Sequence, residues 1–590
     1  MWLAACAMMT FALASATPPN PRGDAVKRAS VLCTPSSTGA GSFDCVLGAA
    51  DAAAWTARAS LSNDMNTTGW GTLAVEANAA APSDAVAAFG AGYVEAALTA
   101  DLIDLTWQNM RSQASPSDAA LAFVEANTAW VRAQAAAAAA TDATETDATA
   151  ADTYWASVAN VYAQLDGIAA GYDAHRGALQ HLTPTQLLLL GMTVELGDVE
   201  QAVNASARPD YGAMTASELE GYVFAHTHCS AMIKVSADLR ELYASHNTWC
   251  SYAAMLRLFK TYTLPFKATA ALGGATTYMF SGYSATIAGI DDFYITDRQL
   301  AVIETTNSVF NGSLFDAVTV QNAVPYWVRV TVATRGASTA KDWHEIFYRY
   351  NSGTYNNQWM TVDYKLFTPG EPLGAGLFWV SEQIPGFHHA EEQTMALQRG
   401  HWPSYNVPFY QDVYDKSGFP AIVRQFGPSR SYELAPRALI FRRDADSAAQ
   451  DLDGVRRFMR LNRWNVTSAA THGRLDPLFP TPDAAIAARA DLMPPGAAGD
   501  GRGPRLGGAI DCKIVTAEMM GAMTVTAIAG PTNNGVSGGD QPVFRWAGDW
   551  NNGSFPHFGH PSSFDFGWVN FSAPKLLGAL RSPHPSPVLD

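Results

Sequence analysis

The chain is 590 residues long, carries a formal net charge of −16, has a pI of about 5.2 and is 48% hydrophobic. This apolar content is enough for a large core, and the length allows either about four domains or one large domain. The acidic balance argues against nucleic acid or an anionic membrane as the main partner.

Residues 1–16 are typical of a secretory signal peptide. An apolar run from Leu3 to Leu13 is followed by Ala14-Ser15-Ala16, which is a small-x-small cleavage pattern. The run is too short for a transmembrane helix, and we find no other uncharged apolar stretch of about 18 residues. We therefore expect a secreted chain without stable membrane insertion.

Cysteines and glycosylation motifs fit this secreted chain. Removal of the signal takes Cys6 away and leaves an odd number of cysteines, which indicates at least one free thiol. We expect a disulfide between Cys33 and Cys45, which are close in the chain, while a pair between Cys250 and Cys512 stays open. Six Asn-x-Ser/Thr motifs are candidate glycosylation sites. They begin at Asn66, Asn204, Asn311, Asn465, Asn552 and Asn570.

The region from Ala52 to Val199 is alanine-rich, and its pattern predicts mostly helix. Within it, Ala133 to Asp152 is low in complexity and is interpreted as an exposed helix or a flexible insert. Thr183 followed by Pro184 predicts a helix start, with the helix running from Gln186 to Leu196.

A strand, turn, strand and helix are predicted between His226 and Phe266. The apolar runs 230–235 and 239–245 are the strands, and Ser236-Ala237-Asp238 is the turn. From Cys250 onward, apolar residues recur at helical spacing, which predicts an amphipathic helix. They are Tyr252, Met255, Leu256 and Phe259.

Strands dominate the pattern after residue 276. A hairpin is predicted from 293–296 and 300–306 around a turn at 297–299, and 359–364 is another strand. The stretch 475–508 is rich in Pro, Gly and Ala and is interpreted as loop. Helices followed by many strands indicate an α+β chain.

Several motifs match one known family: Cys229-Ser230-Ala231, His246-Asn247-Thr248-Trp249, Glu304-Thr305-Thr306-Asn307, the run YNSGTYNNQW at 350–359, Ser404-Tyr405-Asn406 and Pro436-Arg437. Together they resemble the phospholipase B-like family of lysosomal and secreted glycoproteins. The resemblance covers most of the chain from about residue 60, and the ten-residue run is its most specific part.

The resemblance implies a four-layer αββα N-terminal-nucleophile hydrolase sandwich. Such a precursor cuts itself, here between His228 and Cys229, and Cys229 becomes the first residue of a new chain. The pieces would be a fragment 17–228, largely helical in its first part, and a fragment 229–590 with most strands. We expect them to stay associated as one globular unit. The implied activity is the release of fatty acids from phospholipids in lipid degradation.

A new chain end is chemically useful to a thiol nucleophile. A free thiol has a pKa of about 8.5 and an α-amine has one near 8, so the amine can take the thiol proton. Before the cut this nitrogen is an amide, and the precursor is expected to be inactive. Amine, thiol and oxyanion donors suffice for acyl transfer, so no cofactor or metal is implied.

The resemblance also assigns other site residues. His246 would orient substrate or hold the amine, and Trp249 would wall the pocket; a structural histidine and a core aromatic are the open alternatives. Candidate oxyanion donors are Asn406, Asn356 and Thr306. A pocket cation that lowers the pKa of the amine would be Arg437 or, as a weaker candidate, Arg442, unless each is in a structural ion pair.

Other interpretations are weaker. The cluster His226-Thr227-His228-Cys229 and the polar run 388–392, expected to be a solvated loop, could bind metal, but neither has zinc-site spacing. Ser537 lies in a G-x-S-x-G motif without the strand and helix that a nucleophile elbow needs. Cys250 at a helix start, with His388 or His389, would resemble a papain-like enzyme. An amidase acting on lipid or peptide amides and a non-catalytic secreted binding glycoprotein are the remaining alternatives.

Overall fold

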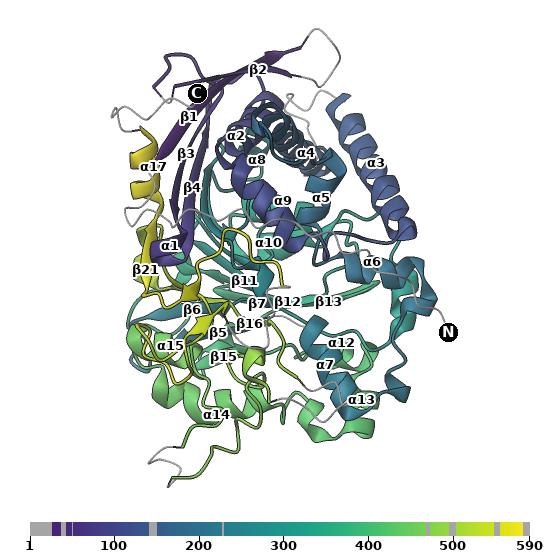
Figure 1. Ribbon diagram of the computed structural model, residues 1–590, viewed down its shortest axis with the longest axis vertical. Helices are drawn as coiled ribbons and strands as arrows, with labels where there is room; N and C mark the ends of the chain where they lie inside the picture. The colour runs from purple at the N-terminus through teal and green to yellow at the C-terminus, as the bar shows by residue number, and fades with distance from the viewer. Residues whose placement is uncertain are drawn as a thin grey trace.

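The computed structural model describes residues 26–36, 43–49, 51–140, 150–226, 229–467, 473–494, 503–547 and 555–581. The predicted signal segment 1–16, His228 and Asn552 lie outside these residues. The chain is mixed α and β, built on two large sheets with helices packed on them (Figure 1), which confirms the α+β class.

The larger sheet has eleven strands in the order β14-β13-β12-β11-β10-β9-β8-β4-β3-β1-β2. Neighbouring strands are antiparallel except β4 and β8, which are parallel. Their bounds are β1 Lys27–Pro35, β2 Phe43–Gly48, β3 Ala57–Asp64, β4 Trp70–Ala77, β8 Leu258–Thr263, β9 Thr277–Gly282, β10 Phe293–Thr296, β11 Leu300–Thr306, β12 Asn357–Asp363, β13 Phe378–Ile384 and β14 Phe387–Glu392. The predicted hairpin is β10–β11 and the predicted strand 359–364 is β12, so both are confirmed.

The smaller sheet has six strands in the order β15-β5-β6-β17-β18-β21. They are β15 His401–Ser404, β5 Ser230–Val235, β6 Leu242–Asn247, β17 Asp511–Val515, β18 Thr524–Ala529 and β21 Val569–Ser572. One buried cluster joins Ile233 and Ala244 of this sheet to Phe259, Ile303 and Val362 of the larger one. The two sheets therefore bury apolar faces against each other.

Helices pack on the sides of the sheets away from this shared core. Helices α2 Asp84–Met110 and α4 Ala150–His175 lie over the larger sheet, and α14 Pro436–Ala448 and α15 Leu452–Met459 lie beside the smaller one (Figure 1). Gly92 lets α2 approach α4 closely, because a Cβ there would lie 2.0 Å from the Gln164 carbonyl oxygen. By length and composition α2 could span a membrane, but it is buried in this packing.

The remaining elements are short or lie at the edges. The helices are α1 Met65–Thr68, α3 Asp118–Ala140, α5 Pro184–Gly191, α6 Leu196–Val203, α7 Ala216–His226, α8 Lys267–Ala271, α9 Tyr326–Gly336, α10 Ala340–Phe347, α11 Thr394–Leu397, α12 Gln411–Lys416, α13 Phe419–Phe426, α16 Ala517–Gly521 and α17 Ala573–Arg581. Two further two-stranded ladders pair β7 Trp249–Ser251 with β16 Gly507–Ala509 and β19 Phe544–Arg545 with β20 Ser563–Phe564.

Local signals were accurate where neighbouring residues decide the structure. Thr183 caps α5: its hydroxyl accepts from the Gln186 N–H, and Gln186 accepts from the Thr183 N–H. That helix begins at Pro184 but already ends at Gly191, before α6 starts at Leu196. The described part of the alanine-rich insert, up to residue 140 and from 150, belongs to α3 and α4.

One predicted helix is wrong, and another helical prediction is correct only in part. The region Ala52–Val199 is mostly helix, from α2 to α6, as predicted, but it begins with the strands β3 and β4, and β1 and β2 precede it, because small alanine side chains also fit a sheet covered by α2. The predicted helix after Cys250 is β7, a 3-10 turn at Tyr252–Ala254 and β8. Tyr252, Met255 and Phe259 are all buried between packed layers, so their spacing did not mark one apolar face.

The structure also tests the predictions for the cysteine pairs and for the polar run 388–392. Cys33 and Cys45 face each other across β1 and β2 and form the predicted disulfide. Cys250 and Cys512 are both free thiols. The run 388–392 is part of the edge strand β14 rather than a loop, and its His389 pairs with Asp412 and stacks on Tyr410.

Candidate active site

Cys229 lies directly before β5 with a left-handed backbone conformation, φ = 83°. Its side chain is fully buried, and Sγ donates a hydrogen bond of 3.6 Å to Oε1 of Glu304 on β11. Burial and the neighbouring Glu304 carboxyl raise the pKa of the thiol well above its usual value, while the Trp249 backbone N–H lowers it. In the uncut chain the sulfur is therefore a protonated thiol next to a carboxyl group.

Glu304 is itself an unusual group. It is fully buried, its Oε1 also accepts a 3.0 Å hydrogen bond from the Tyr355 hydroxyl, and its Oε2 has no partner in the described part of the chain. Burial and the nearby Asp292 raise the pKa of Glu304 well above its usual value. Asp292 has a pKa raised to about 8 by burial, and its Oδ1 accepts hydrogen bonds from Tyr326 and Tyr294.

Arg437 closes the site from the start of α14. Its Nη1 donates to the Cys229 carbonyl oxygen at 2.8 Å and to the Ser230 hydroxyl at 3.0 Å, and its guanidinium lies 4.2 Å from the Trp249 ring centre. Burial lowers its pKa to about 9. No carboxylate forms an ion pair with it among the residues that the structure describes, so this half-buried cation is held by neutral groups.

The predicted oxyanion donors are positioned differently from one another. Asn406 has φ = 70°; its amide donates to the Thr306 carbonyl oxygen at 2.6 Å, and its Oδ1 accepts from Arg437 at 2.5 Å. Asn356 donates to Asp198 and to the Gly353 carbonyl. The structure thus brings Asn406 and Thr306 to Arg437, whereas the Asn356 amide already has two acceptors outside this group.

His246 and Trp249 both border Cys229. His246 is fully buried on β6 and its Nε2 hydrogen-bonds to the Glu304 carbonyl oxygen at 2.9 Å, so Nε2 carries the proton. Its Nδ1 has no partner among the described residues. Burial, assisted by Lys513, lowers its pKa well below the usual value, and the ring is neutral.

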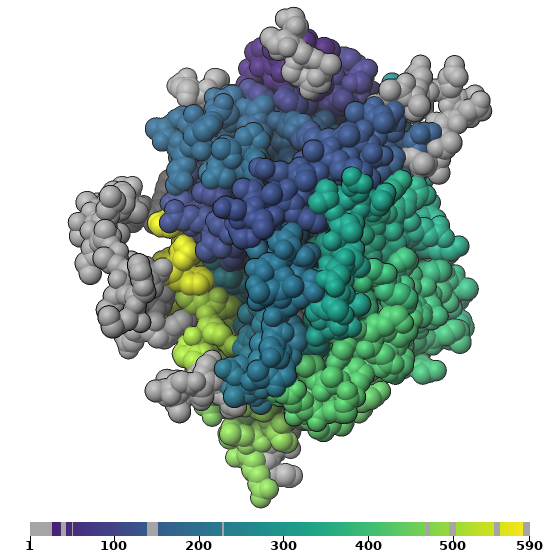
Figure 2. Space-filling model, turned by 90° about the vertical axis from the view of Figure 1, so that its right-hand side faces the viewer, coloured from purple at the N-terminus to yellow at the C-terminus, as the bar shows by residue number. Residues whose placement is uncertain are grey.

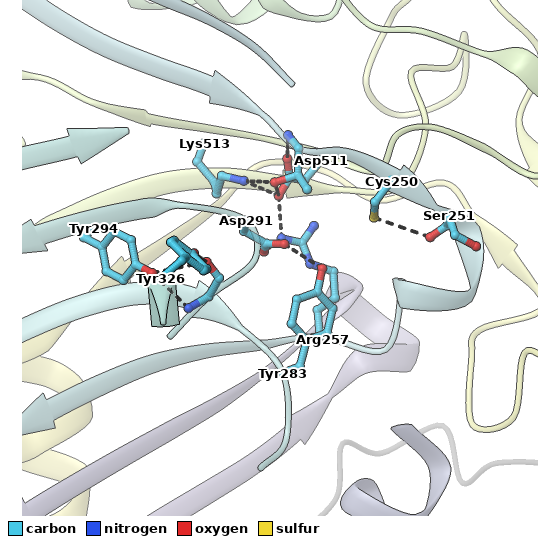
Figure 3. A network of polar contacts seen from close by, with 11 residues as sticks. Cys250, Ser251, Arg257, Tyr283, Asp291, Tyr294, Tyr326, Asp511 and Lys513 are labelled. Carbon is cyan, nitrogen blue, oxygen red and sulfur yellow. Dashed lines mark hydrogen bonds and ion pairs between the residues drawn. The ribbon is translucent and has the colours of Figure 1, made fainter. Parts of the chain in front are cut away.

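Arg257, Asp291, Asp511 and Lys513 form a buried ion network (Figure 3). It holds the segment between His246 and Trp249 through Thr248. Asp511 accepts from the Thr248 N–H at 2.8 Å and from Lys513 at 2.6 Å, and Arg257 lies 2.5 Å from it. Arg257 also pairs with Asp291. The two cations and two carboxylates balance, so this network fixes the loop without adding net charge to the site.

Arg442 does not belong to the site, and its prediction as a pocket cation is wrong. It pairs with Glu433 and its side chain is 55% exposed. Five residues along an α-helix place it about 140° around α14 from Arg437, so both cannot face Cys229.

Two cavities meet at Trp249. One, of about 350 Å³, has a lining that mixes polar and apolar groups, and the polar ones include Asp198, His226 and Thr306. The other, of about 430 Å³, is mostly apolar and reaches Arg437 and Asn406. Its apolar walls include Val223, Phe310, Val407 and Phe419.

Helix α7, whose last residue His226 precedes Cys229 by three positions, contributes to the walls of both cavities. In the face of the molecule that Figure 2 shows, the blue segment that contains α6 and α7 lies between green and yellow parts of the chain. Because α7 lies against both cavities and Cys229 is fully buried, the uncut chain leaves little room for a substrate at the sulfur.

The alternative chemistries gain no support. Ligand-type atoms of Cys229, His246 and Glu304 lie within 4.8 Å of one another, but the hydrogen bonds between them account for this cluster, and we assign no metal to it. Ser537 lies in a loop and donates to the Asn533 carbonyl. Cys250 lies in β7 rather than at a helix start, and burial raises the pKa of its thiol, so the papain-like interpretation is wrong.

The glycosylation motifs differ in exposure. Asn66, Asn204, Asn465 and Asn570 are exposed. Asn311 is half-buried and donates to the Lys416 carbonyl.

Sequence reasoning missed three groups next to Cys229: Glu304, Tyr355 and Lys513. Glu304 and Tyr355 lie within matched motifs, ETTN and YNSGTYNNQW, from which only Thr306 and Asn356 had been chosen. Lys513 is placed opposite His246 by the β6–β17 register, and no local signal indicated it.

Comparisons with known proteins give a consistent answer. A family model described as Phospholipase B matches residues 57–571. Phospholipase B-like protein B of Dictyostelium discoideum is 34% identical over 525 residues, which cover 88% of this chain and 85% of that protein. Putative phospholipase B-like 2 of Homo sapiens is 34% identical over 546 residues, with coverage of 88% and 86%. Phospholipase B-like 1 of Homo sapiens is 33% identical over 513 residues, with coverage of 86% and 85%.

Proposed function

The chain belongs to the phospholipase B family, and from this premise we propose that it is a secreted or lysosomal hydrolase that releases fatty acids from phospholipids. We further propose that it activates itself by cutting between His228 and Cys229 and that its layers are those of an N-terminal-nucleophile hydrolase. Cys229 is then the nucleophile, and its freed amine is the base.

The setting of Cys229 is the observation that carries this proposal. A thiol, a carboxyl group and a half-buried guanidinium, which has no carboxylate partner among the described residues, converge on one residue at the head of a strand. An unpaired guanidinium favours a developing anion and disfavours a protonated amine, because like charges raise the energy of the charged amine. Arg437 therefore suits a site in which an N-terminal amine must be neutral.

The two cavities fit the two ends of a phospholipid. The mostly apolar cavity of about 430 Å³ suits an acyl chain, and the cavity of about 350 Å³, whose lining mixes polar and apolar groups, suits a head group. Trp249 lines both cavities, and its backbone N–H hydrogen-bonds to the Cys229 sulfur. Cys229 is fully buried and is not among the residues that line either cavity in the uncut chain. An acyl carbon at the junction of the cavities would therefore reach the nucleophile only after the cut uncovers it, whether its bond is an ester or an amide.

The test compares Cys229→Ala with Ser537→Ala in secreted protein. Processing is followed by amino-terminal sequencing, and turnover is measured on a phospholipid and on an acyl amide of the same chain length. We expect the mature wild-type fragment to begin at Cys229, Cys229→Ala to stay uncut and inactive, and Ser537→Ala to behave as wild type. Processing of Cys229→Ala at the normal rate would overturn the proposal, and turnover of the amide alone would redirect it to an amidase.

A further inference from the structure

We propose that Glu304 is the proton carrier of the self-cleavage reaction, taking a proton from the Cys229 thiol and delivering it to the Cys229 nitrogen. This inference rests on the proposed function, because it requires that the chain cuts itself at Cys229. It gives Glu304 a role that sequence reasoning assigned to no residue. Among the predicted site residues in the described part of the chain, none accepts a hydrogen bond from the Cys229 sulfur.

Contact geometry selects Glu304. Sγ of Cys229 donates to its Oε1 at 3.6 Å, and the carboxyl group is held from the other side by the Tyr355 hydroxyl at 3.0 Å. Oε2 is buried and has no partner among the described residues. One oxygen thus faces the thiol while the other is free, which is unusual for a buried carboxyl group with a purely structural role.

His246 is another group near the sulfur that could accept a proton, and burial decides between His246 and Glu304. A low-dielectric environment disfavours the charged form of each group, so it strengthens a carboxylate as a base and weakens an imidazole. The directions observed here agree, since the pKa of Glu304 is raised and that of His246 is lowered. Glu304 is therefore the better proton acceptor, and it is the group that the thiol already contacts.

The self-cleavage reaction needs water as its only further reactant, and each bond that forms and each proton that moves can be followed. The Glu304 carboxylate takes the thiol proton as sulfur bonds to the carbonyl carbon of residue 228. The bond from that carbon to the Cys229 nitrogen then breaks, and Glu304 returns the proton to the leaving nitrogen. This gives a thioester and a free amine. Water hydrolyses the thioester, which restores the thiol and leaves a carboxylate at residue 228.

The groups that face Glu304 set the pH at which it can accept a proton. They are Cys229, Asp292, Tyr355, His246 and Lys513. Asp292 opposes ionisation of Glu304, and Lys513 favours it. Because the carboxylate is the reactive form, we expect processing to speed up as pH rises until Glu304 is ionised.

The main test is Glu304→Gln, which keeps the size of the side chain but cannot take up a proton. With uncut protein prepared at low pH, we expect cleavage to slow by at least about 100-fold, as for loss of a general base. Dithiothreitol cleaves a thioester and would release the fragments if the variant formed the thioester but could not hydrolyse it. Because Glu304→Gln should not form the thioester at all, we expect dithiothreitol to release no fragment from it. The matched control is Glu382→Gln, a fully buried carboxyl group on β13 that accepts from Phe409 and Tyr410 and does not contact Cys229.

A second variant covers the case in which Glu304→Gln fails to fold. Glu304→Asp keeps the carboxyl group but withdraws it by one methylene, and we expect at least about 10-fold slower cleavage with an altered rate–pH profile. The inference would be overturned, and the proposed function left intact, if folded Glu304→Gln were cleaved at the wild-type rate, or if Glu304→Asp kept both the rate and the rate–pH profile of the wild type. Wild-type cleavage of Cys229→Ala would instead defeat the proposed function itself, so the two failures are distinguishable.

Discussion

Arg437 donates a 2.8 Å hydrogen bond from Nη1 to the carbonyl oxygen of Cys229, although 208 positions separate the two residues. Partly burying a guanidinium that has no carboxylate partner among the described residues costs free energy, and burial lowers the pKa of Arg437 to about 9. Such a cost is tolerated where the charge has a task, and here the charge lies against the residue that we propose to be the nucleophile.

We expect Arg437→Met to reduce hydrolysis by about 10- to 100-fold, because it removes both the tether on Cys229 and the local positive charge. Arg437→Lys should retain only part of the activity. Lysine keeps the positive charge, but it lacks the planar guanidinium that contacts Cys229 and Asn406 at the same time. Turnover and processing of the purified variants are the measurements. Arg442→Met is the matched control from the same helix, and an equal loss in both variants would show that only helix stability was affected.

The protein should be less stable at pH 8 than at pH 6.5. Burial raises the pKa of Asp198 and Glu382 to about 7 and that of Asp292 to about 8. The folded chain then keeps protons that the unfolded chain loses from about pH 4 upward, so the free energy of unfolding falls as pH rises toward 8. Buried His344 and half-buried His560 have pKa values lowered to about 3, and they reduce the free energy of unfolding only as pH falls below about 6.5.

Asp292→Asn isolates one of these groups. Its Oδ1 can still accept from Tyr326 and Tyr294, while the titration is gone. In the wild type, the free energy of unfolding should fall with pH between 6.5 and 8, and one proton contributes up to about 1.4 kcal/mol per pH unit to this slope. Thermal unfolding of Asp292→Asn should show the slope reduced by that contribution. An unchanged slope would mean that Asp292 is already ionised in the folded chain.

Acyl-chain preference should respond to a change in the apolar cavity. Val407 lines it and is half-buried, so Val407→Trp fills space without adding charge. We expect kcat/KM for long-chain esters to fall about 10-fold or more, while short-chain esters are hydrolysed as before. Val536→Trp, at a residue that is 69% exposed, is the control. An equal loss for all chain lengths would argue that the acyl chain binds elsewhere.

The two cleavage products should remain one particle. Strand β4 of the first fragment pairs with β8 of the second in a six-residue register, and Glu95 of α2 forms a fully buried ion pair with Lys260 at 2.7 Å. We expect two bands on a denaturing gel and a single peak on gel filtration.

Removing one member of that ion pair should loosen the particle. Glu95→Ala leaves Lys260 buried without its partner and should cost about 3–5 kcal/mol, whereas the double variant Glu95→Leu/Lys260→Met should recover much of this. Unfolding by urea measures both. Equal stability of Glu95→Ala and wild type would show that Lys260 is neutral in the fold.

Local sequence determined those features that depend on residues close in the chain. The Thr183 cap, the β10–β11 hairpin and the Cys33–Cys45 disulfide are of this kind, and the conspicuous motifs were enough to identify the family. The helix predicted after Cys250 shows the limit, because a segment buried on all sides carries no periodic contrast between an inner and an outer face.

The surroundings of Cys229 were decided only by the tertiary structure. Glu304 meets the sulfur because β11 of the larger sheet packs against the head of β5, and Arg437 arrives from a helix far along the chain. Arg437 and Arg442 look alike in sequence, yet the turn of α14 sends one to Cys229 and the other to Glu433 at the surface. Which charged groups meet depends on sheet packing and helix rotation, and these are properties of the whole fold.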